Sequence, residues 1–267
     1  MKMMMFSRYI ITGTNNYRTY KYMNTILFDL DGTLLPMDTR GFTDTFFKAV
    51  TGRFSRLGVS AESLRHAMLQ GIDAMMANDG FLTNDECFWN TFSRSISDDG
   101  NPISKGDLKL FKKEFENFYR KDFFVTRLNT TATPLAKECV RMLKNKGYRL
   151  VVATNPVFPE EAMIERIRWA DLDENDFELI TSMENSCFCK PNLNYYRKIL
   201  QMIGVTADEC MMVGNDVTED MCALKLGIDV FLIDECLINK QNIDVTDFKK
   251  GDWKTFRELV SELPEIR

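Results

Sequence analysis

Short apolar runs rich in β-forming residues alternate with helical stretches along most of the chain. The runs lie at 25–30, 148–153, 177–181, 209–213 and 229–233. Stretches with apolar residues at helical spacing precede or separate the later runs, at 134–145, 159–169, 193–203 and 221–226. This alternation predicts an α/β fold, a parallel sheet with helices on both faces and right-handed crossovers between strands.

The first run stands far from the others, and the residues between them follow a different pattern. From 39 to 125 the apolar positions recur mostly three and four residues apart, which predicts helices. Examples are Phe42, Phe46, Phe47, Val50 and Phe54. We therefore expect an all-helical domain at 39–125, inserted into a core made of residues 23–38 and 126–267.

Residues 1–22 show no helical or alternating period, and we expect a flexible leader there. The segment contains four basic residues and no acid, and Arg8 interrupts the apolar stretch that a secretory signal needs. Two explanations stay open: a targeting leader of the transit-peptide type, or an upstream start codon that adds residues before Met23. The second is simpler, because a strand-like run follows Met23 almost at once.

Composition narrows the classes of function. Hydrophobic residues make up 45% of the 267 residues, with no apolar run near the ~18 residues that span a bilayer. The formal charge is -5, and the basic leader makes the remainder more acidic still, so we expect neither nucleic acid nor a membrane as partner. Seven cysteines without a CxxC pair favour a reducing, cytoplasmic location. The single histidine, His66, argues against a zinc centre, so carboxylates, lysine or cysteine must carry any reaction.

The strongest chemical signal lies where the first apolar run ends. Asp29 and Asp31 stand there, followed by Gly32 and Thr33. Two acids beside a buried strand cost folding energy unless a cation meets them. A turn would explain an Asp-Gly pair alone, but the full string is far more specific, and we interpret it as a functional site.

The string DLDGT at 29–33 resembles the first motif of the haloacid dehalogenase (HAD) superfamily of phosphohydrolases. Three further motifs of that family have matches in the expected order, and the resemblance spans residues 25 to about 235. They are VVATN with Thr154, CKPN with Lys190, and VGND with Asp220 shortly after it. The resemblance implies a Rossmann-like core with a helical cap domain inserted between the first and second motifs.

All four motifs lie at or just after the ends of predicted strands, where open parallel sheets bind ligands. Asp29 is suited to be the nucleophile toward a phosphoryl group, and Asp31 to protonate the leaving oxygen and later deprotonate water. Thr154 and Asn155 are expected to bind phosphate oxygens, with Lys190 offsetting negative charge. Alone, Thr154 would be interpreted as a strand-end residue and Lys190 as a solvated loop lysine. Only the ordered set of motifs reverses that interpretation.

Two acids that face a phosphate dianion need a cation, and oxygen ligands favour Mg²⁺, which the resemblance also implies. Asp29 and Asp31 are the first expected ligands. The third is ambiguous, because Asn215 stands where family members often carry an acid, and Asp216 comes one residue later. We favour Asp216, since a charged oxygen binds Mg²⁺ better than a neutral amide oxygen, with Asp220 as a supporting acceptor.

The sequence thus predicts a magnesium-dependent phosphatase that hydrolyses a small cytosolic phosphomonoester through an aspartyl-phosphate intermediate. Family dehalogenases and phosphonatases lack an acid at the position of Asp31, which disfavours both activities. A phosphomutase shares all four motifs and stays an alternative, as does a catalytically idle binding or regulatory module. The expected partner is a small phosphorylated metabolite, while its identity and the oligomeric state are left open.

Overall fold

A six-stranded parallel sheet forms the centre of the structure, a computed structural model that describes residues 23–97 and 100–266. The strands are β1 (Thr25–Phe28), β2 (Arg149–Val152), β3 (Leu179–Ile180), β4 (Cys210–Gly214), β5 (Asp229–Ile233) and β6 (Lys250–Gly251). The predicted α/β fold is confirmed, with a strand at each of the five apolar runs. The sequence prediction missed β6, a strand of 2 residues whose composition carries no β signal.

The strand order brings β1 to the middle of the sheet, in the order β3-β2-β1-β4-β5-β6. After β1 the chain forms β2 and β3 on one side, and then crosses to β4, β5 and β6 on the other. Phe28, the last residue of β1, pairs with Val152 in β2 and with Val213 in β4. The residues that follow these three therefore leave the sheet at one edge, where the strand order reverses and open α/β sheets bind ligands.

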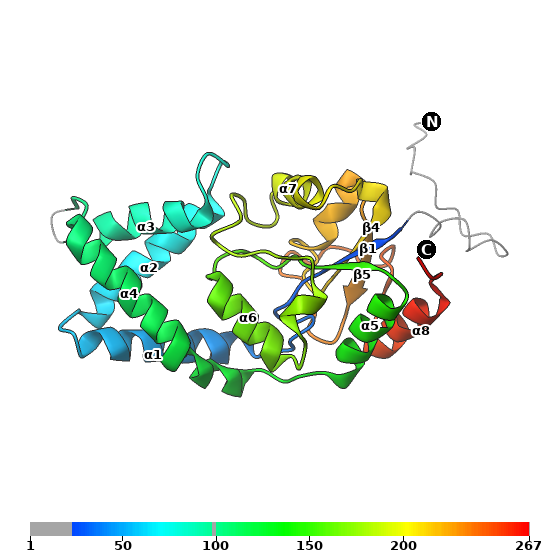
Figure 1. Ribbon diagram of the computed structural model, residues 1–267, viewed down its shortest axis with the longest axis horizontal. Helices are drawn as coiled ribbons and strands as arrows, with labels where there is room; N and C mark the ends of the chain where they lie inside the picture. Colours follow the sequence, from blue (N-terminus) through cyan, green and yellow to red (C-terminus); the bar gives the residue numbers. More distant parts are fainter. Residues whose placement is uncertain (1–22, 98–99, 267) are drawn as a thin grey trace.

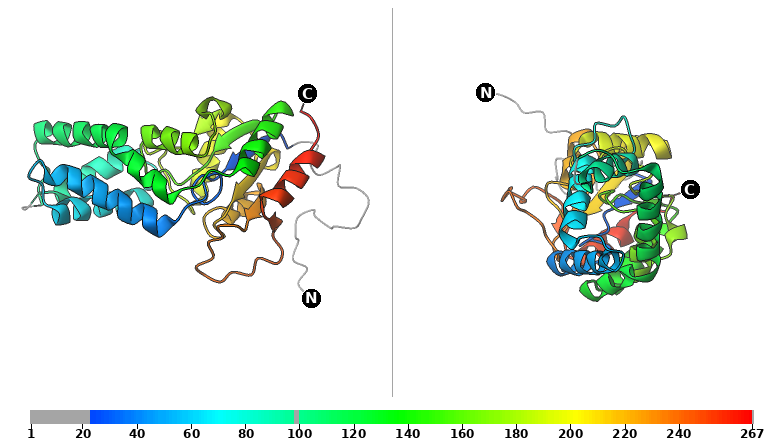
Figure 2. Two further views of the ribbon diagram at one scale, coloured as in Figure 1. Left: turned by 90° about the horizontal axis from the view of Figure 1, so that it is seen from below. Right: turned by 90° about the vertical axis from the view of Figure 1, so that its left-hand side faces the viewer.

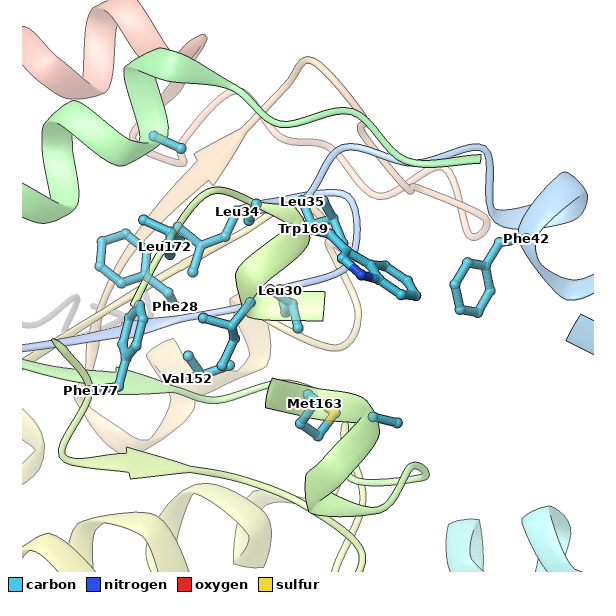
Figure 3. Packing of buried hydrophobic residues seen from close by; sticks show 14 of the residues in the cluster. Phe28, Leu30, Leu34, Leu35, Phe42, Val152, Met163, Trp169, Leu172 and Phe177 are labelled. Carbon is cyan, nitrogen blue, oxygen red and sulfur yellow. The ribbon is translucent and has the colours of Figure 1, made fainter. Parts of the chain in front are cut away.

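Helices cover both faces of the sheet (Figure 1). They are α5 (Pro134–Asn145), α6 (Glu160–Trp169), α7 (Leu193–Ile203) and α8 (Trp253–Glu262). Side chains of β1 alternate between the faces, so Ile26 and Phe28 belong to one buried cluster and Leu27 to another. The Phe28 cluster includes side chains of α5, α6 and α8, and Figure 3 shows part of it. The Leu27 cluster includes side chains of α7.

The chain between β1 and β2 is helical, as the sequence predicts. Its helices are α1 (Thr39–Ser55), α2 (Ala61–Met76), α3 (Asn84–Ser95) and α4 (Lys105–Lys121). Each begins after a residue whose side chain accepts a backbone N–H of the first turn, namely Asp38, Ser60, Thr83 and Ser104. Figures 1 and 2 show these four helices together at one end of the molecule, beyond the sheet. We call α1 to α4 the cap.

Aromatic side chains fill the interior of the cap. The ring of Phe115 in α4 lies 4.7 Å from that of Phe54 in α1 and 5.4 Å from that of Trp89 in α3, between ring centroids. The same buried cluster continues to Phe28 on the face of the sheet. Cap and sheet therefore share one hydrophobic core.

Short 3₁₀ helices complete the chain: η2 (Phe123–Asn129), η3 (Glu174–Asp176), η4 (Ala207–Glu209) and η5 (Met221–Leu226). The helical stretch predicted at 221–226 is a 3₁₀ helix of 6 residues, and Gly227 with its left-handed backbone ends it. Within the described ranges, no helix is both long and apolar enough to cross a bilayer. The leader predicted at 1–22 lies outside the described residues.

The packing of α2 on α3 predicts opposite effects for two glycine substitutions in the cap. A Cβ atom at Gly71 would lie 2.6 Å from Cδ2 of Phe88, whereas a Cβ at Gly52 in α1 would have no neighbour within 4 Å. Gly71→Ala should therefore lower the free energy of unfolding by about 1–3 kcal/mol through overpacking. Gly52→Ala should raise it by about 0.5–1 kcal/mol, because alanine favours a helix interior.

Urea unfolding of both variants checks this prediction. An unchanged midpoint for Gly71→Ala would show that α2 and α3 do not pack as closely as described.

Candidate active site

The loop that follows β1 carries the first motif, at 29–33, and contacts the fourth motif, at 213–216. Asp29 continues the ladder of β1, with its N–H donating to the carbonyl of Val213 at 2.9 Å. Gly32 has a φ of +86°, and a Cβ atom there would lie 2.4 Å from Nδ2 of Asn215. Glycine is needed at this position both for its backbone conformation and for the close approach.

A buried lysine joins two buried carboxylates at the same edge of the sheet. Nζ of Lys190 lies 2.9 Å from Oδ1 of Asp29 and 2.6 Å from Oδ1 of Asp220. Lys190 and Asp220 are each 1% exposed and Asp29 is 7% exposed. The structure thus brings together three of the predicted residues from the first, third and fourth motifs.

The charges in this cluster shift the pKa values of its members. Burial alone would lower the pKa of Lys190, but Asp220 and Asp29 raise it well above its usual value. Burial raises the pKa of Asp220 to about 7, against the opposing effect of Lys190. The neighbouring carboxylate of Asp29 adds a smaller rise to the effect of burial on Asp220.

Thr33 lies between two oxygens that suit a hard cation. Its hydroxyl is 3.1 Å from Oδ2 of Asp29 and 3.0 Å from Oδ1 of Asn215. One hydroxyl carries one proton, so it can donate fully to only one of the two oxygens. Nδ2 of Asn215 donates to the carbonyl of Cys236 at 2.6 Å, while its Oδ1 lies against the hydroxyl of Thr33. These oxygen donors fit Mg²⁺.

The side chain of Asp216 has a different set of neighbours. Its Oδ1 accepts the backbone N–H groups of Thr218 at 2.7 Å and of Glu219 at 2.8 Å. Its own N–H donates to Oδ2 of Asp220 at 2.9 Å. Of the two residues that the sequence offers as metal ligands, Asn215 contacts the loop of the first motif, whereas the side chain of Asp216 accepts backbone N–H groups of its own turn.

The residues of the second motif, Thr154 and Asn155, lie beside Lys190 and form hydrogen bonds with other parts of the protein. Oδ1 of Asn155 accepts the backbone N–H of Lys190 at 3.2 Å, and its Nδ2 donates to Glu219 at 3.2 Å. The carbonyl oxygen of Thr154 accepts from the hydroxyl of Tyr195 at 2.7 Å. Asn155 thus links the second, third and fourth motifs, a structural contribution that the sequence analysis did not foresee.

The side chain of Asp31 pairs with Arg166, a residue that the sequence analysis did not single out. Its Oδ2 accepts from Nη1 of Arg166 in α6 at 2.5 Å, and Arg166 is 0% exposed. Burial raises the pKa of Asp31, while Arg166 opposes the rise. A sequence signal for Arg166 existed, because helical spacing puts it on the apolar face of α6 with Met163 and Trp169. A cation on such a face calls for a buried anion.

The cap contacts the loops that follow β2 and β3. Nδ2 of Asn84, at the start of α3, donates to the carbonyl of Pro156 at 3.1 Å, and its backbone N–H donates to Ser186 at 2.8 Å. The side chain of Met76, at the end of α2, lies 3.9 Å from Nδ2 of Asn155. The cap therefore reaches the edge of the sheet where Asp29 lies.

Comparison with known proteins gives a family and a set of similar folds. The model of the haloacid dehalogenase-like hydrolases matches residues 23–227. A relative from Xenopus laevis, haloacid dehalogenase-like hydrolase domain-containing protein 3, is 29% identical over 111 residues. That match covers 41% of this chain and 44% of the relative, so the likeness spans less than half of either protein.

Solved structures resemble nearly the whole chain. A 2-haloacid dehalogenase from Pseudomonas syringae pv. Tomato gives a TM-score of 0.62 at 17% identity, over 90% of this chain and 98% of that chain. A HAD phosphatase from Thermococcus onnurineus gives 0.54 at 17% identity, over 91% and 100%. A predicted phosphoglycolate phosphatase from Haemophilus somnus gives 0.53 at 17% identity, over 89% and 98%. At these identities the likeness concerns the fold.

Removal of the shared lysine should destabilise the protein strongly. Lys190→Met leaves Asp29 and Asp220 buried without a cation, and we expect the free energy of unfolding to fall by about 3–5 kcal/mol. Adding Asp220→Asn should restore part of this loss. The exposed Lys225 offers a control, since Lys225→Met should change stability by less than about 0.5 kcal/mol.

Urea unfolding at neutral pH measures all three variants. Equal stabilities for Lys190→Met and Lys225→Met would mean that Lys190 is not the counter-charge of a buried cluster.

Proposed function

Because the chain belongs to the haloacid dehalogenase-like hydrolases, we propose that it is a magnesium-dependent phosphatase of a small phosphomonoester. The observation that carries the proposal is the buried cluster of Asp29, Lys190 and Asp220, with Asp31 nearby as a second functional carboxyl group. A cation beside a carboxylate can attract a phosphate dianion that the acids alone would repel.

In the proposed reaction, Asp29 attacks the phosphorus atom of the ester. The bond between phosphorus and the leaving oxygen breaks, and its electron pair stays on that oxygen, which takes a proton from Asp31. Water then attacks the aspartyl-phosphate and gives a proton to Asp31. The bond between Asp29 and phosphorus breaks, its electron pair returns to the carboxylate, and inorganic phosphate leaves.

Lys190, Thr154 and Asn155 support this chemistry by their positions. The ammonium of Lys190 lies against Asp29 and would offset charge on the bound phosphate. Asn155 holds the backbone of Lys190, so we propose that it positions the phosphate site in addition to lining it. Thr154 follows β2 at the edge where Asp29 follows β1, and its hydroxyl is proposed to donate to a phosphate oxygen.

We propose that Asp29 and Asn215 hold the metal. The side chain of Asp31, which the sequence analysis expected as a second ligand, accepts a hydrogen bond from Arg166, and we propose proton transfer as its function. Among the described residues, no three His, Cys, Asp or Glu side chains gather closely enough to hold a metal by themselves. The proposed ligand set therefore depends on the amide oxygen of Asn215, main-chain oxygens, water and the phosphate. When bound, Mg²⁺ would neutralise phosphate charge and favour attack on phosphorus.

Two further aspects of the proposal concern specificity and location. The presence of Asp31 favours a phosphate ester over a haloacid, because carbon–halogen cleavage needs no proton on the leaving group. All seven cysteines are free thiols, which supports a reducing cytoplasmic location. The proposed partner is a small phosphorylated metabolite.

The first test of the proposal is the substitution Asp29→Asn. The amide keeps the shape of the carboxylate but is a poor nucleophile, so turnover of p-nitrophenyl phosphate should fall by ~1,000-fold or more. The wild-type enzyme should release inorganic phosphate, and hydroxylamine should trap its phosphorylated form.

If Asp29→Asn keeps more than about a tenth of the wild-type rate, Asp29 is not the nucleophile. A wild-type protein that hydrolyses no phosphate ester would refute the phosphatase proposal. Transfer of phosphate to a second substrate without its release would favour a phosphomutase.

The second test concerns the metal ligand. A chelator should silence the enzyme and Mg²⁺ should restore it. Asn215→Ala should raise the Mg²⁺ concentration for half-maximal activity by roughly 10-fold or more, because it removes an oxygen beside Asp29. Asp216→Ala should change this concentration little and cost about 1 kcal/mol of stability, because its carboxylate accepts two backbone N–H groups.

Magnesium titrations of both variants, with stability measured in parallel, separate these effects. If Asp216→Ala raises the required Mg²⁺ concentration more than Asn215→Ala does, Asp216 is the ligand.

A further inference from the structure

Two buried side chains hold the main chain of Thr154, and neither belongs to the four motifs. They are Thr181, which directly follows β3, and Tyr195 in α7. We propose that Thr181 and Tyr195 are positioning residues: they fix Thr154 relative to Lys190, so that both side chains meet the five-coordinate phosphorus of the transition state. This inference rests on the proposed phosphatase function and adds two residues to it.

The sheet itself does not hold Thr154. Strand β2 ends at Val152, and the N–H of the next residue, Ala153, donates to the carbonyl of Phe28 in β1 at 2.7 Å. Thr154 is the first residue of this segment whose main chain lies beyond the ladder. It is 2% exposed, and a buried peptide group outside a ladder needs other partners.

Side chains supply these partners. The N–H of Thr154 donates to Oγ1 of Thr181 at 3.1 Å. The hydroxyl of Thr181 lies 2.8 Å from the carbonyl oxygen of Thr154 and 3.2 Å from that of Val152. The hydroxyl of Tyr195 donates to the carbonyl of Thr154 at 2.7 Å. A carbonyl oxygen has two lone pairs, so it can accept from both hydroxyls. Thr181 and Tyr195 are almost fully buried, so little water competes for these contacts.

The contacts hold the residue and leave its side chain available. All of them involve main-chain atoms of Thr154, so its hydroxyl can still bind a ligand. They also connect Thr154 to the third motif, because Tyr195 belongs to the helix that begins three residues after Lys190. Oδ1 of Asn155 makes a second connection, to the backbone N–H of Lys190. Two separate links therefore fix the spacing between the second motif and Lys190.

This spacing matters most when phosphorus has five oxygen neighbours. Groups that are held in place act on the transition state without a cost of reorganisation, and a displacement of about 1 Å can lower a rate ~100-fold. A phosphate in the ground state is tetrahedral and can bind to a loosened site with less loss. Removal of either hydroxyl should therefore weaken interactions with the transition state more than interactions with bound phosphate.

Orthovanadate and inorganic phosphate are matched probes of this difference, because vanadate becomes five-coordinate beside a nucleophilic oxygen and phosphate stays tetrahedral. Thr181→Val and Tyr195→Phe each remove a hydroxyl and keep the approximate shape of the side chain. Each should raise the inhibition constant of vanadate at least about 10-fold more than that of phosphate. For p-nitrophenyl phosphate, kcat should fall by a similar factor with a smaller change in KM. Thr181→Ser keeps the hydroxyl and should restore both values toward those of the wild type.

A buried threonine elsewhere in the chain gives the matched control. Thr126 in η2 is 0% exposed, and its hydroxyl donates to the carbonyl of Phe123 at 2.8 Å. Thr126→Val loses a buried hydrogen bond but should leave kcat and the ratio of the two inhibition constants unchanged. In the double variant of Thr181→Val and Tyr195→Phe, the loss should be smaller than the product of the single losses, because both hydroxyls hold the same carbonyl.

Several outcomes would overturn the inference. Equal losses of affinity for vanadate and phosphate would show that Thr181 and Tyr195 have a merely structural function, while the phosphatase proposal would stand. A changed ratio in Thr126→Val, or fully multiplicative losses in the double variant, would also contradict it. If Thr181→Val does not fold, Tyr195→Phe decides by the ratio of its two inhibition constants. Failure of the wild type to hydrolyse p-nitrophenyl phosphate would instead refute the proposed function.

Discussion

A single buried ammonium group must satisfy two buried carboxylates, and the architecture of the site follows from this constraint. Lys190 lies between Asp29 and Asp220, and all three are almost fully removed from water. Each charge would cost several kcal/mol in isolation. The three come from loops after β1, β3 and β4, so they meet only because those strands are parallel and in register at one edge. The site can therefore form only because β1 lies in the middle of the sheet, between β2 and β4.

The same constraint gives a physical reason for an amide at Asn215. Asp29, Asp31 and Asp220 already lie at this edge against Lys190 and Arg166, and Asp216 and Glu219 lie next to them. A further ionised carboxylate would add to this excess of negative charge, and the pKa of Asp220 is already raised to about 7. An amide supplies an oxygen without charge. Its Nδ2 is held by the carbonyl of Cys236, so that oxygen is already oriented before any ligand binds.

The strands and the helices of the cap could be predicted from the sequence because they depend on local pattern, whereas Lys190 was expected at the site only through the ordered set of four motifs. Apolar runs predicted β1 to β5, and helical spacing predicted the cap. Other features depend on tertiary structure. Asn215 and Asp216 differ by one residue along a turn, and which of them contacts the first motif depends on the hydrogen bonds of that turn. Arg166 lies 135 residues from Asp31, and β6 is a strand by virtue of its pairing with β5.

The two acids of the first motif have separate cations, and this division gives each a different chemistry. Asp29 lies against Lys190, whose own pKa is raised by Asp220 and Asp29, so the cation beside Asp29 keeps its charge. Asp31 lies against Arg166 instead, and burial raises the pKa of Asp31 while Arg166 opposes the rise. Similar groups can acquire different functions when their environments differ in this way. The separation of Asp29 and Asp31 by one residue turns them toward different partners, as the proposed division into a nucleophile and an acid requires.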